Sequence, residues 1–244
     1  MPFDVIHHEP GSGRLVWPPL IQGTLLQRYK RFLADVRLRN GHTVVAHCPN
    51  SGSMLACSEP GRTVYLSRHN TPKRQLRYTW ELIRMPTSLV GVNTMVPNRL
   101  VKAAILADRI QGLSGYDRVR SEVAYGTHSR IDLLLEKGSL RCFVEVKNCT
   151  LVTNGVASFP DAVTARGLKH LKELQAQIRS GDRSVMFYLI QRMDANLFRP
   201  ADSIDPAYGR ELRRAMENGL EVMAYDVTID VNGIELNSEI PFDI

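Results

Sequence analysis

The segment Arg130–Asn148 constrains the fold most, because it predicts a tight β-hairpin whose residues alternate between two dissimilar faces. Gly138-Ser139 separates the two arms, and glycine at the first central position suits a two-residue type II′ turn. A turn of this length fixes the register, so that the numbers of paired residues sum to 277. Asp132 is therefore expected directly opposite Glu145.

This register places Asp132, Glu145 and Lys147 on one face, because side chains two positions apart in a strand point the same way. Two facing carboxylates repel each other, and partial burial makes it costlier to keep both charged. A bound Mg²⁺ or Mn²⁺ ion removes this cost, since such ions use one or two carboxylates and keep waters for a substrate phosphate. The alternative is a solvated face on which Lys147 forms an ion pair with either acid.

Several further stretches extend the D-x(12)-E-V-K pattern of the hairpin into a resemblance that spans residues 23–242. With HCPNSGSM, YTWEL, SRID, FVEVKN and FPDAVTARGLKHL, the chain resembles the sugar fermentation stimulation protein family. The resemblance implies an α+β or α/β chain: a small N-terminal OB-like β-barrel, then a PD-(D/E)xK nuclease-like mixed sheet flanked by helices. It also implies DNA binding, a role in regulating sugar metabolism, and a catalytic set of Asp132, Glu145 and Lys147. The family frequently has Glu where this chain has Ala103.

The expected barrel, residues 1–84, and the expected nuclease-like domain, residues 85–244, differ in charge. Residues 1–84 contain 12 Lys and Arg against 5 Asp and Glu, whereas residues 85–244 contain 19 against 20. An excess of +7 in one third of the chain indicates a polyanionic partner. Residues 1–22 are expected to be irregular, and the short strands that follow, with Gly, Pro and Asn turns, predict a barrel.

Cationic and aromatic side chains are interleaved in the barrel, as in proteins that hold nucleic acid by phosphate contacts and base stacking. Phe32, on an expected strand from Leu25 to Leu38, and Trp80 are expected in its core. A second basic cluster opens the helix expected from Ala165 to Ser180. The alternative for both clusters is a solvated basic surface. The candidate nucleic-acid contacts are Arg28, Lys30, Arg31, Arg68, Lys73, Arg74 and Arg77 in the barrel, and Arg166, Lys169 and His170 on the helix.

Two residues of the expected second domain bear on the metal site. Glu122, on a strand expected from Arg118 to Tyr125, is a candidate third metal ligand if that strand pairs in register; the alternative is an ion pair with Arg120 or Arg130. Asn98 is expected to cap a helix that runs to about Gln111.

The remaining features narrow the class of protein. The sequence has no apolar run long enough to span a membrane and no signal-peptide core. Its four cysteines lack zinc spacing and are expected to be reduced thiols in a cytoplasmic protein. No motif for an organic cofactor is present.

We therefore expect a DNA-binding protein with little sequence preference and a Mg²⁺- or Mn²⁺-dependent nuclease-type site. The alternative is a non-catalytic DNA-binding regulator of sugar utilisation built on a nuclease scaffold. Single- and double-stranded DNA are both possible partners, and the oligomeric state stays open.

Overall fold

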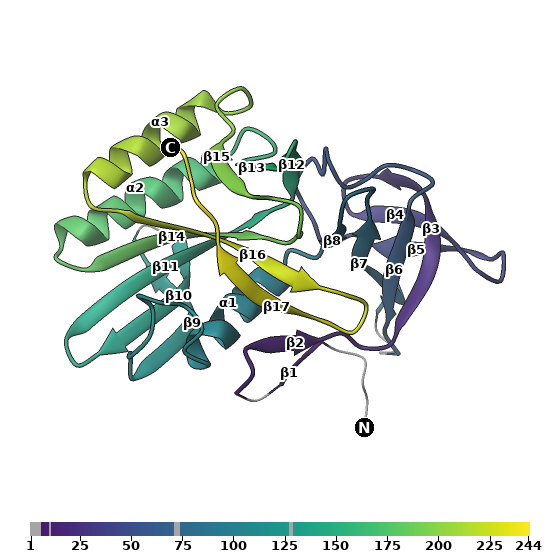
Figure 1. Ribbon diagram of the computed structural model, residues 1–244, viewed down its shortest axis with the longest axis horizontal. Helices are drawn as coiled ribbons and strands as arrows, with labels where there is room; N and C mark the ends of the chain where they lie inside the picture. The colour runs from purple at the N-terminus through teal and green to yellow at the C-terminus, as the bar shows by residue number, and fades with distance from the viewer. Residues whose placement is uncertain (1–5, 10, 71–73, 127–128) are drawn as a thin grey trace.

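The computed structural model describes residues 6–9, 11–70, 74–126 and 129–244, which form a small barrel beside a larger sheet flanked by helices (Figure 1). The barrel sheet has the order β5-β4-β3-β6-β7-β8, and pairing of β5 with β7 closes it, which confirms the predicted OB-like barrel. Its strands are β3 (Leu20–Tyr29), β4 (Leu33–Leu38), β5 (Thr43–His47), β6 (Thr63–Arg68), β7 (Tyr78–Arg84) and β8 (Leu89–Gly91).

The turn between β3 and β4 differs from the single strand predicted for residues 25–38. Lys30 and Arg31 adopt φ angles of 47° and 65°, so the chain reverses there. Phe32 follows in the same turn and is 44% exposed, so its predicted place in the core is wrong, whereas Trp80 is fully buried as predicted. The turn thus presents an aromatic ring beside two cations at the surface of the barrel.

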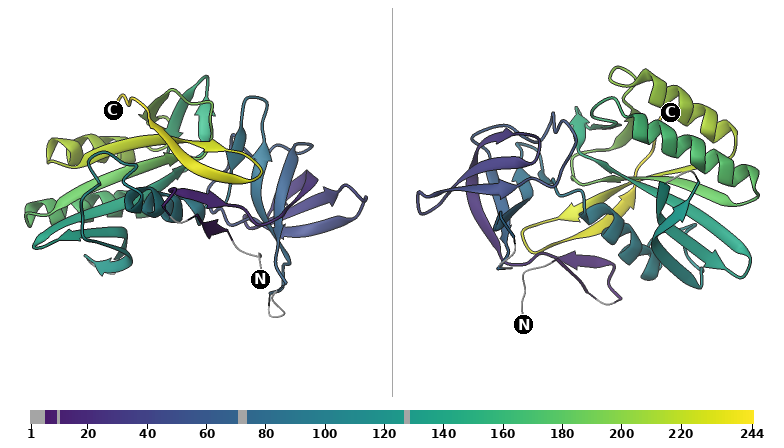
Figure 2. Two further views of the ribbon diagram at one scale, coloured as in Figure 1. Left: turned by 60° about the horizontal axis from the view of Figure 1, so that its bottom comes forward. Right: turned by 180° about the vertical axis from the view of Figure 1, so that it is seen from behind.

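The larger sheet is mixed and has the order β1-β2-β17-β16-β14-β11-β10-β9. Helix α1 packs on one face and helices α2 and α3 on the other (Figures 1 and 2). Two apolar clusters follow this division: Leu133 and Val144 belong to the cluster with α1, and Leu134 and Phe143 to the cluster with α2 and α3. The elements are β1 (His7–His8), β2 (Arg14–Val16), α1 (Val96–Leu106), β9 (Arg118–Tyr125), β10 (Ser129–Lys137), β11 (Leu140–Cys149), α2 (Ala165–Arg179), β14 (Arg183–Ile190), α3 (Pro206–Glu217), β16 (Glu221–Ile229) and β17 (Gly233–Glu239), with a small sheet of β12 (Leu151–Thr153), β13 (Val156–Phe159) and β15 (Leu197–Pro200).

Helix starts follow local capping chemistry. The Thr164 hydroxyl accepts from Gly167 N (3.0 Å) at the start of α2, and the Asp205 carboxylate accepts from Tyr208 N (3.0 Å) at the start of α3. Helix α1 begins at Val96, with a proline in its first turn, so the prediction of Asn98 as N-cap is wrong. Asn98 lies inside the helix, where its side chain is available to the site described below.

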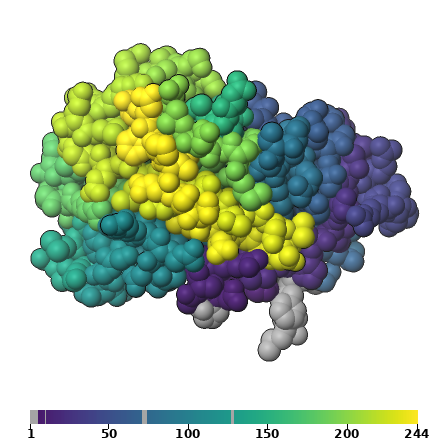
Figure 3. Space-filling view, in the orientation of Figure 1, coloured from purple at the N-terminus to yellow at the C-terminus, as the bar shows by residue number. Residues whose placement is uncertain are grey.

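The boundary between the two units differs from the predicted division at residue 84. β1 and β2, from a segment expected to be irregular, join the edge of the larger sheet, and β8 extends the barrel to Gly91. In the space-filling view the C-terminal strands, in yellow, abut the N-terminal segment and the barrel (Figure 3). All four cysteines are buried and free. Within the described residues, no helix combines the length and apolarity that crossing a membrane requires.

Candidate metal centre and nucleic-acid interface

The hairpin of β10 and β11 has the predicted register. Its pairs run from Leu133–Val144 to Lys137–Leu140, each with numbers that sum to 277, and Gly138 adopts the positive φ, 57°, that a type II′ turn needs. Beyond the Leu133–Val144 pair, the Asp132 side chain replaces the backbone as hydrogen-bond acceptor: its Oδ2 accepts from the Val146 N–H at 2.8 Å. The Asp132 carboxylate is thereby fixed against β11, at the position the register predicts.

Asp132 and Glu145 line one pocket of about 460 Å³ between the barrel and the larger sheet. Asn98 of α1 donates to Asp132 Oδ1 at 2.7 Å, so both oxygens of this carboxylate are held. Burial, and then the charge of Glu145, raise the pKa of Asp132 to about 6. Burial and a neighbouring like charge thus both disfavour the ionised form of Asp132.

Glu145 is 2% exposed, and its two oxygens have different surroundings. Oε1 accepts from Lys147 Nζ at 2.6 Å and from His170 Nδ1 in a short hydrogen bond. Oε2 is buried and has no hydrogen-bond partner among the described residues. Burial raises the pKa of Glu145, but the charge of Lys147 and the contact with His170 outweigh it, so the pKa is lowered overall. Glu145 is therefore held ionised with one oxygen unused.

His170 lies inside the pocket. Its ring is 4% exposed, and its Nε2 lies 3.4 Å from Arg166 Nε. Its Nδ1 contacts Glu145 Oε1 and also lies 3.2 Å from Lys147 Nζ, while its Nε2 faces the Arg166 donor. Of the basic cluster predicted on α2 to contact nucleic acid, Arg166 and His170 line the pocket, whereas Lys169 pairs with Glu173 (3.7 Å) outside it.

The structure does not bring Glu122 to this pair. Glu122 is exposed in β9 with φ 55°, its carbonyl accepts from Arg130, and it is not among the residues that line the pocket. Ala103 is buried in the apolar cluster around α1. Within the ranges that the structure describes, no group of three or more His, Cys, Asp or Glu is placed to hold a metal. The candidate centre consequently rests on two carboxylates.

The barrel contributes one wall of the pocket through the loop Asn50–Ser53. Arg28 donates to the carbonyl oxygens of Asn50 (2.9 Å), Gly52 (2.9 Å) and Ser53 (3.2 Å). Its guanidinium is thus engaged within the protein, which differs from the predicted contact with nucleic acid. Arg31, in contrast, is exposed and lines the pocket.

The other predicted barrel contacts lie in the β3–β4 turn and in or beside the β6–β7 connection. Lys30, Arg68 and Arg77 are exposed, and Arg74 donates to Thr79 Oγ1 at 2.6 Å. Lys73 lies outside the described residues.

Asp161 joins the two walls of the pocket, although its residue type and spacing predicted no role for it. Its carbonyl accepts from Ser53 Oγ at 2.6 Å, and its Oδ2 accepts from the Met54 N–H at 2.9 Å. Gly52 lies so close that an added Cβ would meet Asp161 Oδ2 at 2.7 Å. Asp161 and Gly52 lie in two of the family-like stretches, which marks both segments in the sequence but does not predict their contact.

We predict that Asp161→Ala frees the barrel loop, because the Met54 N–H loses its acceptor. An unmet hydrogen bond of this kind costs about 1–2 kcal/mol of unfolding free energy. Hydrogen exchange at the Met54 amide should accelerate in Asp161→Ala and stay slow in the control Asp161→Asn, whose side-chain oxygen can still accept. Equal exchange in the two variants would contradict this role.

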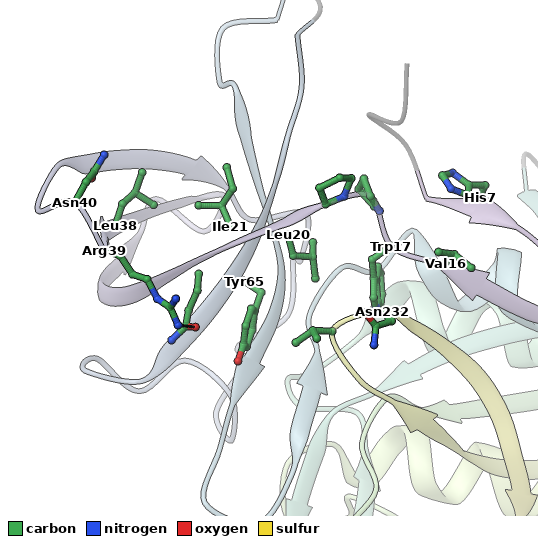
Figure 4. Close-up of a pocket in the computed structure, with 14 residues that line it drawn as sticks. His7, Val16, Trp17, Leu20, Ile21, Leu38, Arg39, Asn40, Tyr65 and Asn232 are labelled. Atoms are coloured by element: carbon green, nitrogen blue, oxygen red, sulfur yellow. Dashed lines mark hydrogen bonds between the residues drawn. The ribbon is translucent and has the colours of Figure 1, made fainter. Parts of the chain in front are cut away.

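A larger hollow, of about 950 Å³, lies elsewhere (Figure 4). It lies between the barrel residues Leu20 and Tyr65 and the connection at Trp17, whose indole N–H donates to the Asp230 carbonyl at 2.9 Å. No Asp or Glu is among the described residues that line it. The buried carboxylates Asp132 and Glu145 line the smaller pocket instead.

Comparison with known proteins covers almost the whole chain. Residues 26–92 match the SfsA N-terminal OB domain, and residues 95–233 match the sugar fermentation stimulation protein RE domain. Sugar fermentation stimulation protein homologs from Geobacter sulfurreducens and Pelobacter propionicus are each 54% identical, over 91% and 92% of this chain and 96% and 97% of theirs. The homolog from Paramagnetospirillum magneticum is 49% identical over 93% of this chain and 96% of its own.

A solved structure of Pyrococcus furiosus SfsA in complex with Ca²⁺ shares the fold with a TM-score of 0.86 at 26% identity. The match covers 93% of this chain and 96% of that one. The chain therefore belongs to the sugar fermentation stimulation protein family.

Proposed function

We propose that this protein is a divalent-metal-dependent DNA phosphodiesterase that binds DNA mainly through contacts with the sugar-phosphate backbone of the DNA. The observation that carries the proposal is Glu145 Oε2, which is buried and has no hydrogen-bond partner among the described residues. Glu145 lines the same pocket as Asp132, and Lys147 donates to its other oxygen. A buried carboxylate oxygen without a donor is costly, and a cation in the pocket would remove that cost.

The residues fit a hard divalent ion. Glu145 Oε2 has no donor among the described residues, and the Asp132 carboxylate keeps lone pairs beyond the two that accept from Asn98 and Val146. Mg²⁺, Mn²⁺ and Ca²⁺ all favour such oxygen ligands, and the Pyrococcus furiosus relative is described in complex with Ca²⁺. When bound, such an ion would supply Lewis-acid chemistry to a phosphate and a more acidic bound water.

The protein's own groups have separate tasks around that site. Lys147 neutralises Glu145 and is placed to stabilise charge that develops on a phosphate oxygen. His170 fixes the orientation of Glu145 through Oε1, leaving Oε2 turned to other partners. Arg166 of α2 and Arg31 of the barrel, which both line the pocket, supply cations for phosphates next to the reacting one.

The barrel supplies the rest of the interface through the loops that OB folds commonly use, between their first and second strands and between their fourth and fifth. Here these are the β3–β4 turn, with Lys30, Arg31 and Phe32, and the β6–β7 connection, with Arg74 and Arg77. Contacts of this kind read the backbone and the faces of bases, so they give little sequence preference.

We predict that Phe32→Ala weakens binding of single-stranded DNA. The ring is 44% exposed beside two cations, and stacking of one base on an aromatic ring contributes about 1–3 kcal/mol. Fluorescence anisotropy in EDTA should show a loss of affinity of about 5- to 150-fold, with little change in the melting temperature. Leu140→Ala, which removes a 66%-exposed apolar side chain at the far end of the β10–β11 hairpin, should bind like the wild type. If the two variants bind DNA equally, Phe32 is no stacking platform.

The second candidate function is a DNA-binding regulator of sugar utilisation that does not cleave. Ala103 favours it, because α1 offers no carboxylate at the position where members of the family often have Glu. A two-carboxylate centre is sparse for a nuclease, although Mg²⁺ is often held by no more than that.

One experiment separates the two functions. Purified protein is incubated with end-labelled single-stranded and double-stranded DNA of the same sequence, with Mg²⁺, Mn²⁺ or EDTA. Cleavage that needs the metal and disappears in Glu145→Gln supports the phosphodiesterase. Tight binding to both strand types with no cleavage under any metal supports the regulator.

A further inference from the structure

A second polar cavity, of about 190 Å³, lies next to the pocket around Asp132 and Glu145. The two share a wall made of two chain segments: Asn50 and Thr94 line the first pocket, whereas Pro49, Asn93 and Met95 line the second cavity. Thr94 ties these segments together, since its N–H and its hydroxyl both donate to the Pro49 carbonyl, at 3.2 and 2.6 Å. Anything extended that occupies the first pocket therefore passes close to the second.

Two arginines from different units border this cavity, Arg74 from the β6–β7 connection and Arg99 from α1. Arg74 donates to Thr79 Oγ1 and Arg99 to the Ile6 carbonyl. In the part of the chain that the structure describes, neither guanidinium has a carboxylate within ion-pair distance. Burial lowers the pKa of Arg99, and the charge of Glu81 offsets this only in part. Each guanidinium has five N–H donors, and each donates one hydrogen bond to a described residue, so it keeps donors for a ligand.

The carboxylate of Glu81, which also borders this cavity, does not satisfy them. Glu81 is 2% exposed, and its Oε1 and Oε2 accept from Ser67 Oγ (2.6 Å) and Asn93 Nδ2 (2.7 Å). The other titratable groups that the structure places at the cavity are His47 and His69, and they add no negative charge. The cavity thus presents two arginine forks with no matching acceptor among the described residues, which is the arrangement that a phosphate group fits.

We propose that this cavity binds a backbone phosphate of the nucleic-acid strand whose neighbouring phosphate lies in the Asp132–Glu145 pocket. Arg74 and Arg99 hold this phosphate together, one from the barrel and one from the larger unit. The inference rests on the proposed function, because it takes DNA as the ligand. It assigns Arg99, in the nuclease-like half of the chain, to the DNA-binding surface, and it makes the junction between the two units part of that surface.

The test is binding of a short single-stranded oligonucleotide in EDTA, where no metal-dependent cleavage can occur, as a function of salt. Loss of one phosphate contact should lower the slope of log affinity against log salt by about 0.7. Arg74→Gln and Arg99→Gln should each show this and bind about 3- to 10-fold more weakly. Because both hold the same phosphate, the double variant should lose less than the product of the single losses. Arg84→Gln, an exposed charge at the other end of β7, should leave slope and affinity unchanged.

A second arm uses inorganic phosphate and separates failure of the site from failure of the proposed function. Phosphate at constant ionic strength should raise the melting temperature of the wild type above that in chloride, and the double variant should lose this protection. If the wild type binds no oligonucleotide but keeps the phosphate effect, the assignment to a nucleic-acid strand is overturned, together with the proposed function. Unchanged oligonucleotide affinity and slope in both arginine variants overturn the site itself, whatever the nuclease assay shows.

Discussion

Replacing Glu145 with glutamine is expected to abolish both divalent-metal binding and cleavage. Glutamine is nearly isosteric with glutamate, so the hairpin and the hydrogen bond to His170 persist, but one of two charged ligands is gone. Without a substrate phosphate, the one carboxylate that remains binds a divalent ion more weakly than the pair does. Calorimetric titration with Mn²⁺ should show no binding, and cleavage should fall by at least about 10³-fold.

Lys147→Ala is the matched comparison, because it removes a charge from the same site without removing an oxygen ligand. Metal binding should survive, and it should tighten where the competing cation beside Glu145 is lost. Cleavage should nevertheless fall by about 10²–10³-fold, since the lysine acts on charge that develops in the reaction. If Lys147→Ala also loses metal binding, the lysine is a structural partner of Glu145 and does not take part in the cleavage reaction.

Asp132→Asn is expected to stabilise the ion-free protein at neutral and alkaline pH. The pKa of Asp132 rises from 3.8 to about 6 on folding, so the folded state favours the protonated carboxyl. Below about pH 4 both states are protonated and the group costs nothing. The cost then grows with pH up to about 6 and stays constant above it, at about 3 kcal/mol for a shift of this size.

Chemical denaturation in EDTA at pH 8 should therefore show Asp132→Asn more stable than the wild type by up to about 3 kcal/mol. The difference should shrink towards zero near pH 4. Mg²⁺ or Mn²⁺ at pH 8 should reverse the order by stabilising the wild type alone. A variant that is less stable than the wild type at every pH would show that the hydrogen bonds of the carboxylate outweigh its burial.

The hairpin could be predicted residue by residue because a two-residue turn allows one register, and alternation then fixes which side chains share a face. The turn at Lys30–Phe32 could not, because two non-glycine residues adopt positive φ angles there and the residue types carry no sign of it. Arg28 was assigned to the surface since an arginine suits phosphate, yet the carbonyl groups that it binds come from a loop 22–25 residues further along the chain.

The residue type of His170 predicts a nucleic-acid contact, but its spacing from Arg166 carries a more specific signal. Arg166 and His170 are four residues apart and share a helix face, whereas Lys169 faces a different direction with Glu173. What the spacing could not give was that this face of α2 points at Glu145. The residue type of Asn98 suits an N-cap as well as a hydrogen-bond donor to Asp132. Only the start of α1 at Val96 shows that Asn98 has the second role.

Both ends of the barrel connect to the larger unit, because β1 and β2 of the larger sheet precede the barrel in the chain and α1 follows it. The barrel is therefore tethered at both ends, through residues 17–19 and 92–95, which prevents free rotation against the larger unit. A protease that cuts one tether would leave the two units associated. A truncated protein of residues 85–244 would also lack β2, so the edge of β17 would be unpaired. An unpaired edge strand promotes aggregation.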